Sequence, residues 1–297
     1  MTSTETGAVV VEKVAGKSTV TRCFSKYPLK FIIPNKVGGL KTDAVWIYSL
    51  TYGGGIVSGD SISCSFSVGD GCVAVLTTQA STKVYKTLAN KCSYQSLEAK
   101  VGRDALFVVI PDPVACFSTA RYSQRQIFRV LSDSNLVLVD WFTSGRYESG
   151  EKWEFGFYKS TNNIFSEDGQ PIFLDSVLLE QGSIGSIAER MQDYQVIAMV
   201  IILGPMLRDI QARVQENVRK MMSGSLHTTR RATGCSAASN SAFHSSKPDF
   251  IASCSAFGHM GVGLNIRVAA KTTEAIQQFL CHQLASLEPL LGATPYH

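Results

Sequence analysis

The sequence predicts a mainly β protein in which stacked antiparallel sheets form one large domain, with two helices in the C-terminal third. Short runs rich in Val, Ile, Phe and Tyr recur along the chain and are separated by Gly, Asp, Asn and Ser, as in proteins built from many short strands. Two longer stretches instead place apolar residues at helical spacing. The chain has 297 residues, of which 45% are hydrophobic and 18% charged. This balance is typical of a folded globular protein, and we expect one domain over residues 1–297.

The predicted strands are short apolar runs bounded by turn residues. In chain order they are residues 45–52, 72–78, 105–110, 126–131, 135–142, 152–158, 171–179, 195–203, 249–257 and 261–268. In the run KWEFGFY the large residues alternate, so Trp153, Phe155 and Phe157 are expected on one side of a strand. The segment SVGDGC places Asp70 and Gly71 between two strand-like runs, which predicts a hairpin turn.

The first predicted helix covers residues 205–224. Pro205 suits a first helical turn, and Gly224 is expected to end the helix. One face carries an apolar stripe, formed by Leu207, Ile210, Val214, Val218 and Met221. The segment that follows, residues 225–247, is rich in Ser, Ala and Thr, and we expect a mobile surface loop there.

The second predicted helix begins near residue 272, where Thr272 or Thr273 can cap its N-terminus. Its apolar stripe consists of Ile276, Leu280, Leu284 and Leu287. Pro289 is expected to terminate it, because proline cannot continue a helix.

Charge and composition exclude several classes of protein. The net charge is +4 with a pI near 8.6, and there is no Lys/Arg-rich run, so nucleic-acid binding is not expected. The longest apolar run, from Val196, is too short to span a bilayer, and the N-terminal residues do not resemble a secretory signal. The eight cysteines form no C-x-x-C pair. Cys64, Cys72, Cys116 and Cys254 lie in apolar or alternating segments and are expected to be reduced, which favours a cytoplasmic protein.

A glycine-rich segment, residues 52–87, combines glycines, an acidic turn and a hydroxyl-rich stretch. Gly54 and Gly59 have the spacing of a P-loop, but Asp60 follows where that motif needs a lysine, so nucleotide binding is disfavoured. A dinucleotide fingerprint is absent because Ser58 occupies the third glycine position. The simplest interpretation of this segment is a glycine-rich turn with a structural aspartate.

Three blocks of the sequence resemble the UreD family of urease accessory proteins, called UreH in some organisms, and particularly its eukaryotic, plant-like branch. The first is the glycine-rich segment, the second is PDPVACFSTARYSQ from Pro111, and the third is DWFTSGRYESGEKWEFGFYKS from Asp140. They cover about the first half of the chain in order, and the C-terminal third matches more loosely. The resemblance assigns structural roles to Gly54, Gly55, Gly59, Thr77, Thr78, Gln79, Ser81, Thr82, Lys83, Tyr85, Pro111, Asp112, Pro113, Gly145 and Arg146.

The resemblance also implies a fold and a function. The fold would be an elongated, β-helix-like stack of strands with two helices. The protein would bind the accessory protein UreF, which recruits the GTPase UreG, and the complex would dock on apo-urease and help nickel reach its active site. On this basis we expect a non-catalytic scaffold and chaperone, with nickel handled transiently and no stably bound cofactor.

Acidic residues within the family blocks are the candidates for a transient nickel path: Asp60, Asp140, Glu148 and Glu151. Nickel(II) accepts carboxylate, imidazole and water ligands, and a transfer route needs ligands that exchange easily. Asp140 is the most suggestive, because it ends an apolar run, where an unpaired carboxylate is costly. The alternative is that these residues cap turns or pair with Arg146 and Lys152. Cys254 and His259 alone make no metal site.

Two other functions remain open from the residues alone. The first is a β-rich protein-interaction module unrelated to nickel. A loss of urease activity in cells that lack the protein would argue against this function. The second is a hydrolase, but no G-x-S-x-G elbow is present, since Val57 occupies the middle position between Gly55 and Gly59.

Overall fold

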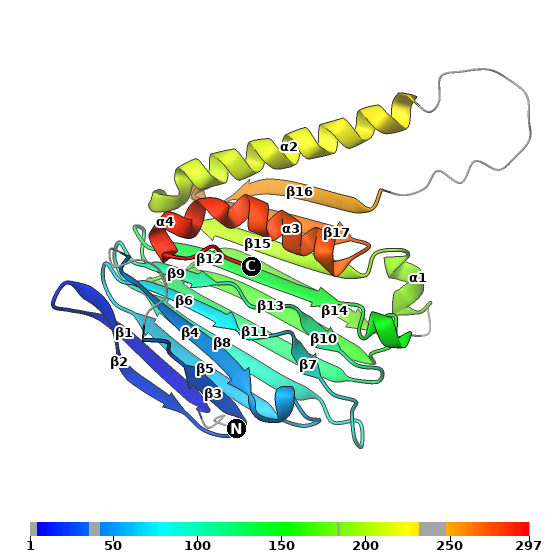
Figure 1. Cartoon of the computed structure of the whole chain (residues 1–297), viewed down its shortest axis with the longest axis horizontal. Coiled ribbons are helices and arrows are strands. Elements are labelled where there is room, and N and C mark those ends of the chain that lie inside the picture. The colour runs from blue at the N-terminus through cyan, green and yellow to red at the C-terminus, as the bar shows by residue number, and fades with distance from the viewer. Residues whose placement is uncertain (1–4, 36–41, 183–184, 232–247, 297) are drawn as a thin grey trace, which may run out of the picture.

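A computed structural model describes residues 5–35, 42–182, 185–231 and 248–296, with only the backbone described for residues 224–231. Within these residues the strands form two sheets, of seven and ten strands, which lie face to face, and the long helices cover one of them (Figure 1). The mainly β fold with a stacked, helix-like arrangement of strands is therefore confirmed.

The seven-stranded sheet, sheet A, has the strand order β14-β13-β11-β8-β5-β1-β2. Its strands are β1 (Gly7–Val14), β2 (Lys17–Ser25), β5 (Ser61–Val68), β8 (Ser93–Val101), β11 (Arg121–Val130), β13 (Phe157–Ser166) and β14 (Pro171–Glu180).

The ten-stranded sheet, sheet B, has the order β16-β17-β15-β12-β9-β6-β4-β3, and two short strands, β7 and β10, pair beside β12. Its strands are β3 (Leu29–Ile32), β4 (Ala44–Thr51), β6 (Val73–Thr78), β7 (Thr82–Val84), β9 (Leu106–Val109), β10 (Val114–Cys116), β12 (Asn135–Thr143), β15 (Val196–Leu203), β16 (Phe250–Phe257) and β17 (Gly263–Ala270).

The direction of strand pairing differs from the predicted antiparallel sheets. From β4 to β13 the chain passes back and forth between sheet B and sheet A, so successive strands of each sheet run in the same direction. The pairs β5–β8, β8–β11 and β11–β13 in sheet A, and β4–β6, β6–β9 and β9–β12 in sheet B, are all parallel. Antiparallel pairs lie towards the ends of both sheets. Alternating residues predict a strand but not the sheet it joins.

Two local predictions were also wrong. The turn at Asp70 and Gly71 joins β5 of sheet A to β6 of sheet B, so it is not a hairpin, and the Asp70 carboxylate instead accepts a hydrogen bond from the amide of Arg103 at 2.8 Å in the next coil. The residues around Trp153 form no strand. Trp153 has a φ of +59°, and β13 begins only at Phe157.

The helices are α1 (Ile187–Met191), α2 (Arg208–Arg231), α3 (Thr273–Leu284) and α4 (Glu288–Leu291). As predicted, Pro205 opens a short 3-10 turn that leads into α2, and Thr272 caps α3 by accepting the amide of Ala275 at 3.2 Å. Gly224 does not end α2. A glycine inside a helix costs only about 1 kcal/mol, which neighbouring residues can offset.

The loop and the second helix end also differ from expectation. Residues 225–231 belong to α2, whereas 232–247 lie outside the described residues. The second helix ends at Leu284, and Pro289 lies instead in the first turn of α4, where its missing amide costs nothing. Within the described part of the chain, none of the helices combines the length and the apolarity that a membrane crossing requires.

Two apolar layers make up the core. The first lies between the two sheets and the second between sheet B and the helices. Strand β12 serves both: Leu136 and Leu138 enter the first layer, and Val137 and Val139 enter the second. Burial on both faces explains why this strand reads as a continuous apolar run. As expected, Cys64, Cys72 and Cys116 are buried free thiols, and Cys254 is a half-buried one.

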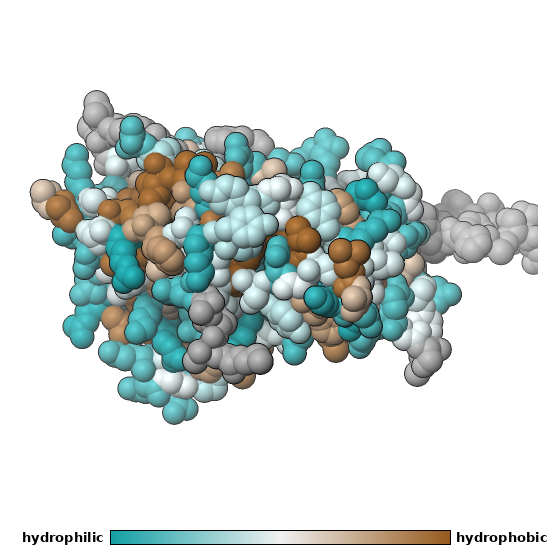
Figure 2. Space-filling view, turned by 90° about the horizontal axis from the view of Figure 1, so that it is seen from below, coloured by the Kyte–Doolittle hydropathy of each residue, from teal (hydrophilic) through white to brown (hydrophobic). Residues whose placement is uncertain are grey.

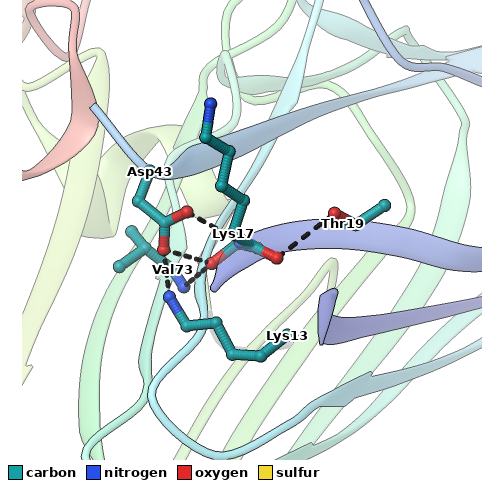
Figure 3. A network of polar contacts seen from close by, with 6 residues as sticks. Lys13, Lys17, Thr19, Asp43 and Val73 are labelled. Carbon is teal, nitrogen blue, oxygen red and sulfur yellow. Dashed lines mark hydrogen bonds and ion pairs between the residues drawn. The ribbon is translucent and has the colours of Figure 1, made fainter. Parts of the chain in front are cut away.

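A polar clasp fastens the N-terminal strands of sheet A to sheet B (Figure 3). Asp43, just before β4, accepts hydrogen bonds from the amide of Ser18 at 2.7 Å, from its hydroxyl at 2.7 Å and from Lys13. The Ser18 hydroxyl in turn accepts the amide of Val73 on β6 at 3.0 Å. Burial on its own raises the pKa of the Asp43 carboxyl, but the Lys13 and Ser18 contacts outweigh it and hold that pKa below its usual range.

We expect Asp43→Ala to lower the free energy of unfolding by about 1 kcal/mol at neutral pH, because the clasp loses its common acceptor at a partly exposed site. The folded pKa of Asp43 is lowered, so its contribution is present above the unfolded pKa and is lost as the pH falls through the folded pKa. Urea unfolding of both proteins as a function of pH tests this. A stability difference that stays constant into strong acid would contradict the role of the charge.

Candidate functional site

A polar layer crosses the otherwise apolar space between the two sheets. On the inner face of sheet A, strand register places Gln124 of β11 beside Gln95 of β8 and Ser160 of β13. From the facing sheet, Asp140 of β12 reaches this row. Asp140 shares its side of β12 with Leu136 and Leu138, whose side chains enter the core between the sheets.

Asp140 is a buried carboxylate held by neutral donors. It is 8% exposed. Gln124 donates to its Oδ1 at 2.6 Å, and Ser160 and Asn162 donate to its Oδ2 at 2.5 Å and 2.7 Å. Within the described residues, no Lys, Arg or His forms an ion pair with it. Burial raises the pKa of Asp140, and the three hydrogen bonds oppose that rise.

The hydrogen-bond row continues beyond Asp140. The hydroxyl of Tyr122 donates to Gln95 Oε1 at 2.9 Å and lies 3.2 Å from Gln124 Oε1. Both glutamines therefore have their acceptor oxygens engaged by Tyr122, which leaves the Gln124 amide nitrogen to face Asp140. The layer is thus oriented to present donors to a negative charge.

A cavity of about 70 Å³ lies against this layer, and Asp140, Gln124, Gln95 and Asp112 are among its lining residues. A second cavity of about 200 Å³ shares four lining residues with it, namely Ser49, Thr78, Thr82 and Gln95. The second cavity is also lined by the exposed Gln79 and Ala80. The two cavities are therefore neighbours: one lies at the surface beside the first family block and the other against the buried carboxylate.

Asp112, which was expected to have a structural role, places a second carboxylate at the cavity of about 70 Å³, here called the inner cavity. The cavity of about 200 Å³ is called the outer cavity. Its Oδ2 accepts the hydroxyl of Thr78 at 3.1 Å, and the same hydroxyl accepts the Asp112 amide at 2.8 Å. Burial raises the pKa of Asp112, and the Thr78 hydrogen bond opposes the rise. The carbonyl of Pro111 accepts the indole of Trp141 at 2.7 Å, which fixes the turn that carries Asp112.

The remaining motif residues of the first and second blocks are structural in their contacts. Gly55 packs so closely that a Cβ there would lie 2.6 Å from the carbonyl oxygen of Lys83. The hydroxyl of Tyr85 donates to the carbonyl of Gly53 at 3.1 Å, and that of Thr77 donates to the carbonyl of Ile110 at 2.8 Å. The carbonyl of Pro113 accepts the amide of Thr82 at 3.0 Å. Gly54 has a φ of +73°. Ser81 is one of the residues that line the outer cavity.

Asp60 does not join the polar layer. Its Oδ2 accepts the amide of Val57 at 2.9 Å across a turn in which Gly59 has a φ of +86°. A carboxylate that satisfies a turn amide is the structural alternative foreseen for this residue. Glu148 lies exposed in a short 3-10 helix, Tyr147–Ser149.

Glu151 has a cationic partner, in contrast to Asp140. Its carboxylate pairs with Arg146 through two guanidinium nitrogens, one of them at 3.1 Å, and also accepts the amide of Ser118 at 3.2 Å. The Arg146 guanidinium stacks over Phe117, 4.2 Å from the ring centre. The Arg146 hydrogen bond is the main cause that lowers the pKa of Glu151. Gly145, with a φ of +120°, allows the chain to turn there.

The carboxylates of the path hypothesis therefore do not form one cluster. Among the described residues, no group of three or more His, Cys, Asp or Glu side chains is placed to hold a metal ion. Cys254 packs toward the helices, and His259 lies exposed in the turn between β16 and β17. Burial raises the pKa of Cys64, a thiol beside the inner cavity, to about 12, so it stays protonated. Apart from this thiol, the metal-binding side chains among the described residues that line the cavity, Asp112 and Asp140, offer oxygen atoms.

Sequence reasoning missed the donors around Asp140. Gln124, Ser160 and Asn162 occupy the alternate positions of their strands that face the core, where an apolar residue is the rule. A polar residue at an inward position of a predicted strand was the available signal. It could be read only by knowing which face of each strand is buried.

Comparison with known proteins gives one consistent family. The model of the UreD urease accessory protein family matches residues 5–297. Urease accessory protein D of Arabidopsis thaliana is 64% identical over 291 residues, which cover 98% of this chain and 99% of the relative. Urease accessory protein D of Oryza sativa subsp. indica is 62% identical, with 98% and 95% covered. The bacterial UreD of Anaeromyxobacter sp. is 32% identical over 290 residues, with 98% and 88% covered.

We expect Glu151→Gln to reduce the free energy of unfolding by about 1–2 kcal/mol at neutral pH, since Arg146 loses its charged partner. The folded pKa of Glu151 is lowered, so the difference should be largest above the unfolded pKa and vanish in acid below the folded one. Thermal unfolding over a pH series measures this. An unchanged melting temperature at neutral pH would show that the pair contributes nothing.

Proposed function

Because the chain belongs to the UreD family of urease accessory proteins, we propose that it acts in urease maturation as a non-catalytic scaffold that lets nickel pass through its β sandwich. In this proposal it joins UreF and the GTPase UreG, docks on apo-urease and works in the cytoplasm. GTP hydrolysis belongs to the partner, in agreement with Asp60 standing where a P-loop needs its lysine.

The observation that supports the nickel path is the carboxylate of Asp140, which is buried beside a cavity without a cationic partner among the described residues. A buried carboxylate held only by neutral donors attracts a divalent cation, because the cation supplies the charge that the site lacks. Asp112 offers a second carboxylate at the same cavity. Nickel(II) accepts such oxygen ligands, and two carboxylates without thiolates bind it loosely enough for release.

The cavities give the proposed path a direction. Nickel enters at the exposed Gln79 and Ala80, passes Thr78 and reaches Asp112 and Asp140. Asp60, Glu148 and Glu151 were proposed on sequence alone. The contacts of Asp60 and Glu151 favour structural roles, so we now assign the buried part of the path to Asp140 and Asp112.

The scaffold role is supported by the exposed apolar surface. Viewed from below, hydrophobic side chains gather toward the left of the molecule, the side on which β1 and β2 lie in Figure 1 (Figure 2). Exposed apolar residues of these strands and their neighbours include Val14, Phe24 and Ile32, which are 41–49% exposed. Apolar surface of this kind is covered when a partner docks. An interaction module unrelated to nickel is the alternative, and normal urease activity in cells lacking the protein would favour it.

We expect Asp140→Asn to keep the fold and to lower the nickel content of urease matured with it. Asn keeps the shape and one acceptor oxygen but places its NH2 group against at least one of the three donors, which is unfavourable. Because burial also disfavours the ionised form of Asp140, removing the charge offsets part of this cost, and the variant should melt within a few degrees of the wild type at neutral pH. Asp140→Ala, by contrast, leaves three buried donors without an acceptor and should cost about 1–3 kcal/mol. The measurements are thermal unfolding and metal analysis of purified urease.

The matched control is Asp168→Asn, which removes the same charge from an exposed turn between β13 and β14. It should leave nickel loading unchanged. Full nickel loading by a folded Asp140→Asn variant would exclude Asp140 from the path.

We further expect this protein and UreF to co-elute on size-exclusion chromatography after co-expression, because the exposed apolar surface is better buried in a complex. The protein expressed alone should be less soluble. Two folded proteins that elute separately at all tested concentrations would contradict the scaffold role, whatever the fate of the nickel path.

A further inference from the structure

Among the described residues, the outer face of sheet A has no layer of helices like the one that covers the outer face of sheet B. Helices α2, α3 and α4 all contact strands of sheet B. On β11 the inward residues Tyr122, Phe128 and Val130 enter the core, so the residues between them point away from it. Because the parallel strands of sheet A are connected through strands of sheet B and not through helices, this outer face is left open to a partner.

The central strand of this face carries a column of cations. Arg121, Arg125 and Arg129 stand four residues apart on the outward side of β11, which corresponds to a spacing of about 13 Å. Lys100 of β8 and Lys159 of β13 lie on the same face. We call these five residues the cationic face.

Two of these cations stand opposite each other on neighbouring strands. Strand register pairs Arg129 with Lys100, and like charges opposite each other on a sheet are destabilising. Glu98 lies two residues along β8, opposite Ile127, and lines the same surface cavity as both cations, but within the described residues no ion pair joins it to either of them. A like-charge pair at exposed positions of strands that are hydrogen-bonded on both sides indicates a surface whose charge suits an anionic partner.

The guanidinium groups at both ends of the column are already ordered. Arg121 lies over Phe157 at 5.1 Å and Arg129 over Phe165 at 5.9 Å, each stacked on its register partner of β13. Ordered side chains lose less entropy on binding. The surface around them is rich in hydroxyl groups, contributed by Ser61, Ser63, Ser65, Ser67, Ser96, Ser123, Thr161 and Ser176. A cavity of about 280 Å³ lies in this surface beside Lys100 and Arg129.

We propose that the cationic face docks on a carboxylate-rich surface of a protein partner. Glu180 forms an ion pair with Arg121 at 3.6 Å, and Glu98 lies on the same face, so a partner must place its carboxylates opposite the cations that have no ion pair among the described residues. A protein surface can be patterned in this way, whereas a uniformly charged phosphate backbone cannot. Leu174 and Leu178 of β14 also border the face, 58% and 54% exposed, and apolar side chains beside arginines are typical of protein interfaces. The proposal concerns a surface on the far side of sheet A from the cavity, so it stands or falls independently of the nickel path.

The test compares two doubly charge-reversed variants of the full chain. One is Arg125→Glu with Arg129→Glu on the cationic face. The control is Lys30→Glu with Arg213→Glu, which makes the same change in net charge at exposed positions of β3 and α2. The probe is a short fluorescein-labelled peptide of alternating Glu and Ser, and binding is followed by fluorescence anisotropy over a range of salt concentrations.

We expect the face variant to bind the peptide about tenfold more weakly and with a smaller dependence on salt, and the control to bind like the wild type. Arg125→Gln with Arg129→Gln provides a milder variant, and thermal unfolding verifies that each variant is folded. Equal binding by the face and control variants, or a wild type that does not bind, would overturn the proposal. A labelled single-stranded DNA that binds the face more tightly than the peptide would overturn it in favour of nucleic acid.

Discussion

The passage of successive strands between two facing sheets is the constraint on which the site depends. Because the chain crosses from one sheet to the other at almost every turn between β4 and β13, the central strands of each sheet are parallel and in continuous register. Side chains at the same height then stand side by side across strands. That is how Gln95, Gln124 and Ser160, which are far apart in the sequence, become one buried row. Asp140, from the facing sheet, accepts hydrogen bonds from Gln124 and Ser160 of this row and from Asn162, two residues further along β13.

Asp140 and Glu151 show how two acidic residues of one family block acquire different roles. Glu151 has an arginine partner and a lowered pKa, and its charge stabilises a loop. Asp140 is taken out of water, has a raised pKa, and is surrounded by dipoles instead of a counter-ion. Burial therefore makes ionisation of Asp140 more costly than in water, and a cation that approaches it would offset this cost. This difference in environment, and not the residue type, makes Asp140 the better candidate for handling a metal ion.

Strand β11 links the two surfaces to which we assign function. Gln124 points inward to Asp140, while Arg125, the next residue, points to the outside of sheet A, where it is part of the cationic face. The strand is paired on both sides, to β8 and β13, which holds both side chains in fixed positions. A partner on the outer face and an ion in the inner cavity can thus be bound by one rigid sheet, without a conformational change in the scaffold.

The sequence by itself determined the mainly β class, the starts of α2 and α3 and the family, because apolar periodicity, capping residues and the three blocks are local in the chain. It also identified Asp140 as unusual, since a carboxylate ending an apolar strand is costly wherever the strand packs. Tertiary structure alone decided that the strands are parallel and that Asp112 shares the cavity with Asp140. It also decided that Asp60 and Glu151 are satisfied locally. The physical reason is that alternation fixes which residues share a face of one strand, whereas the sheet that a strand joins, and the side chains it meets there, depend on contacts between residues distant in sequence.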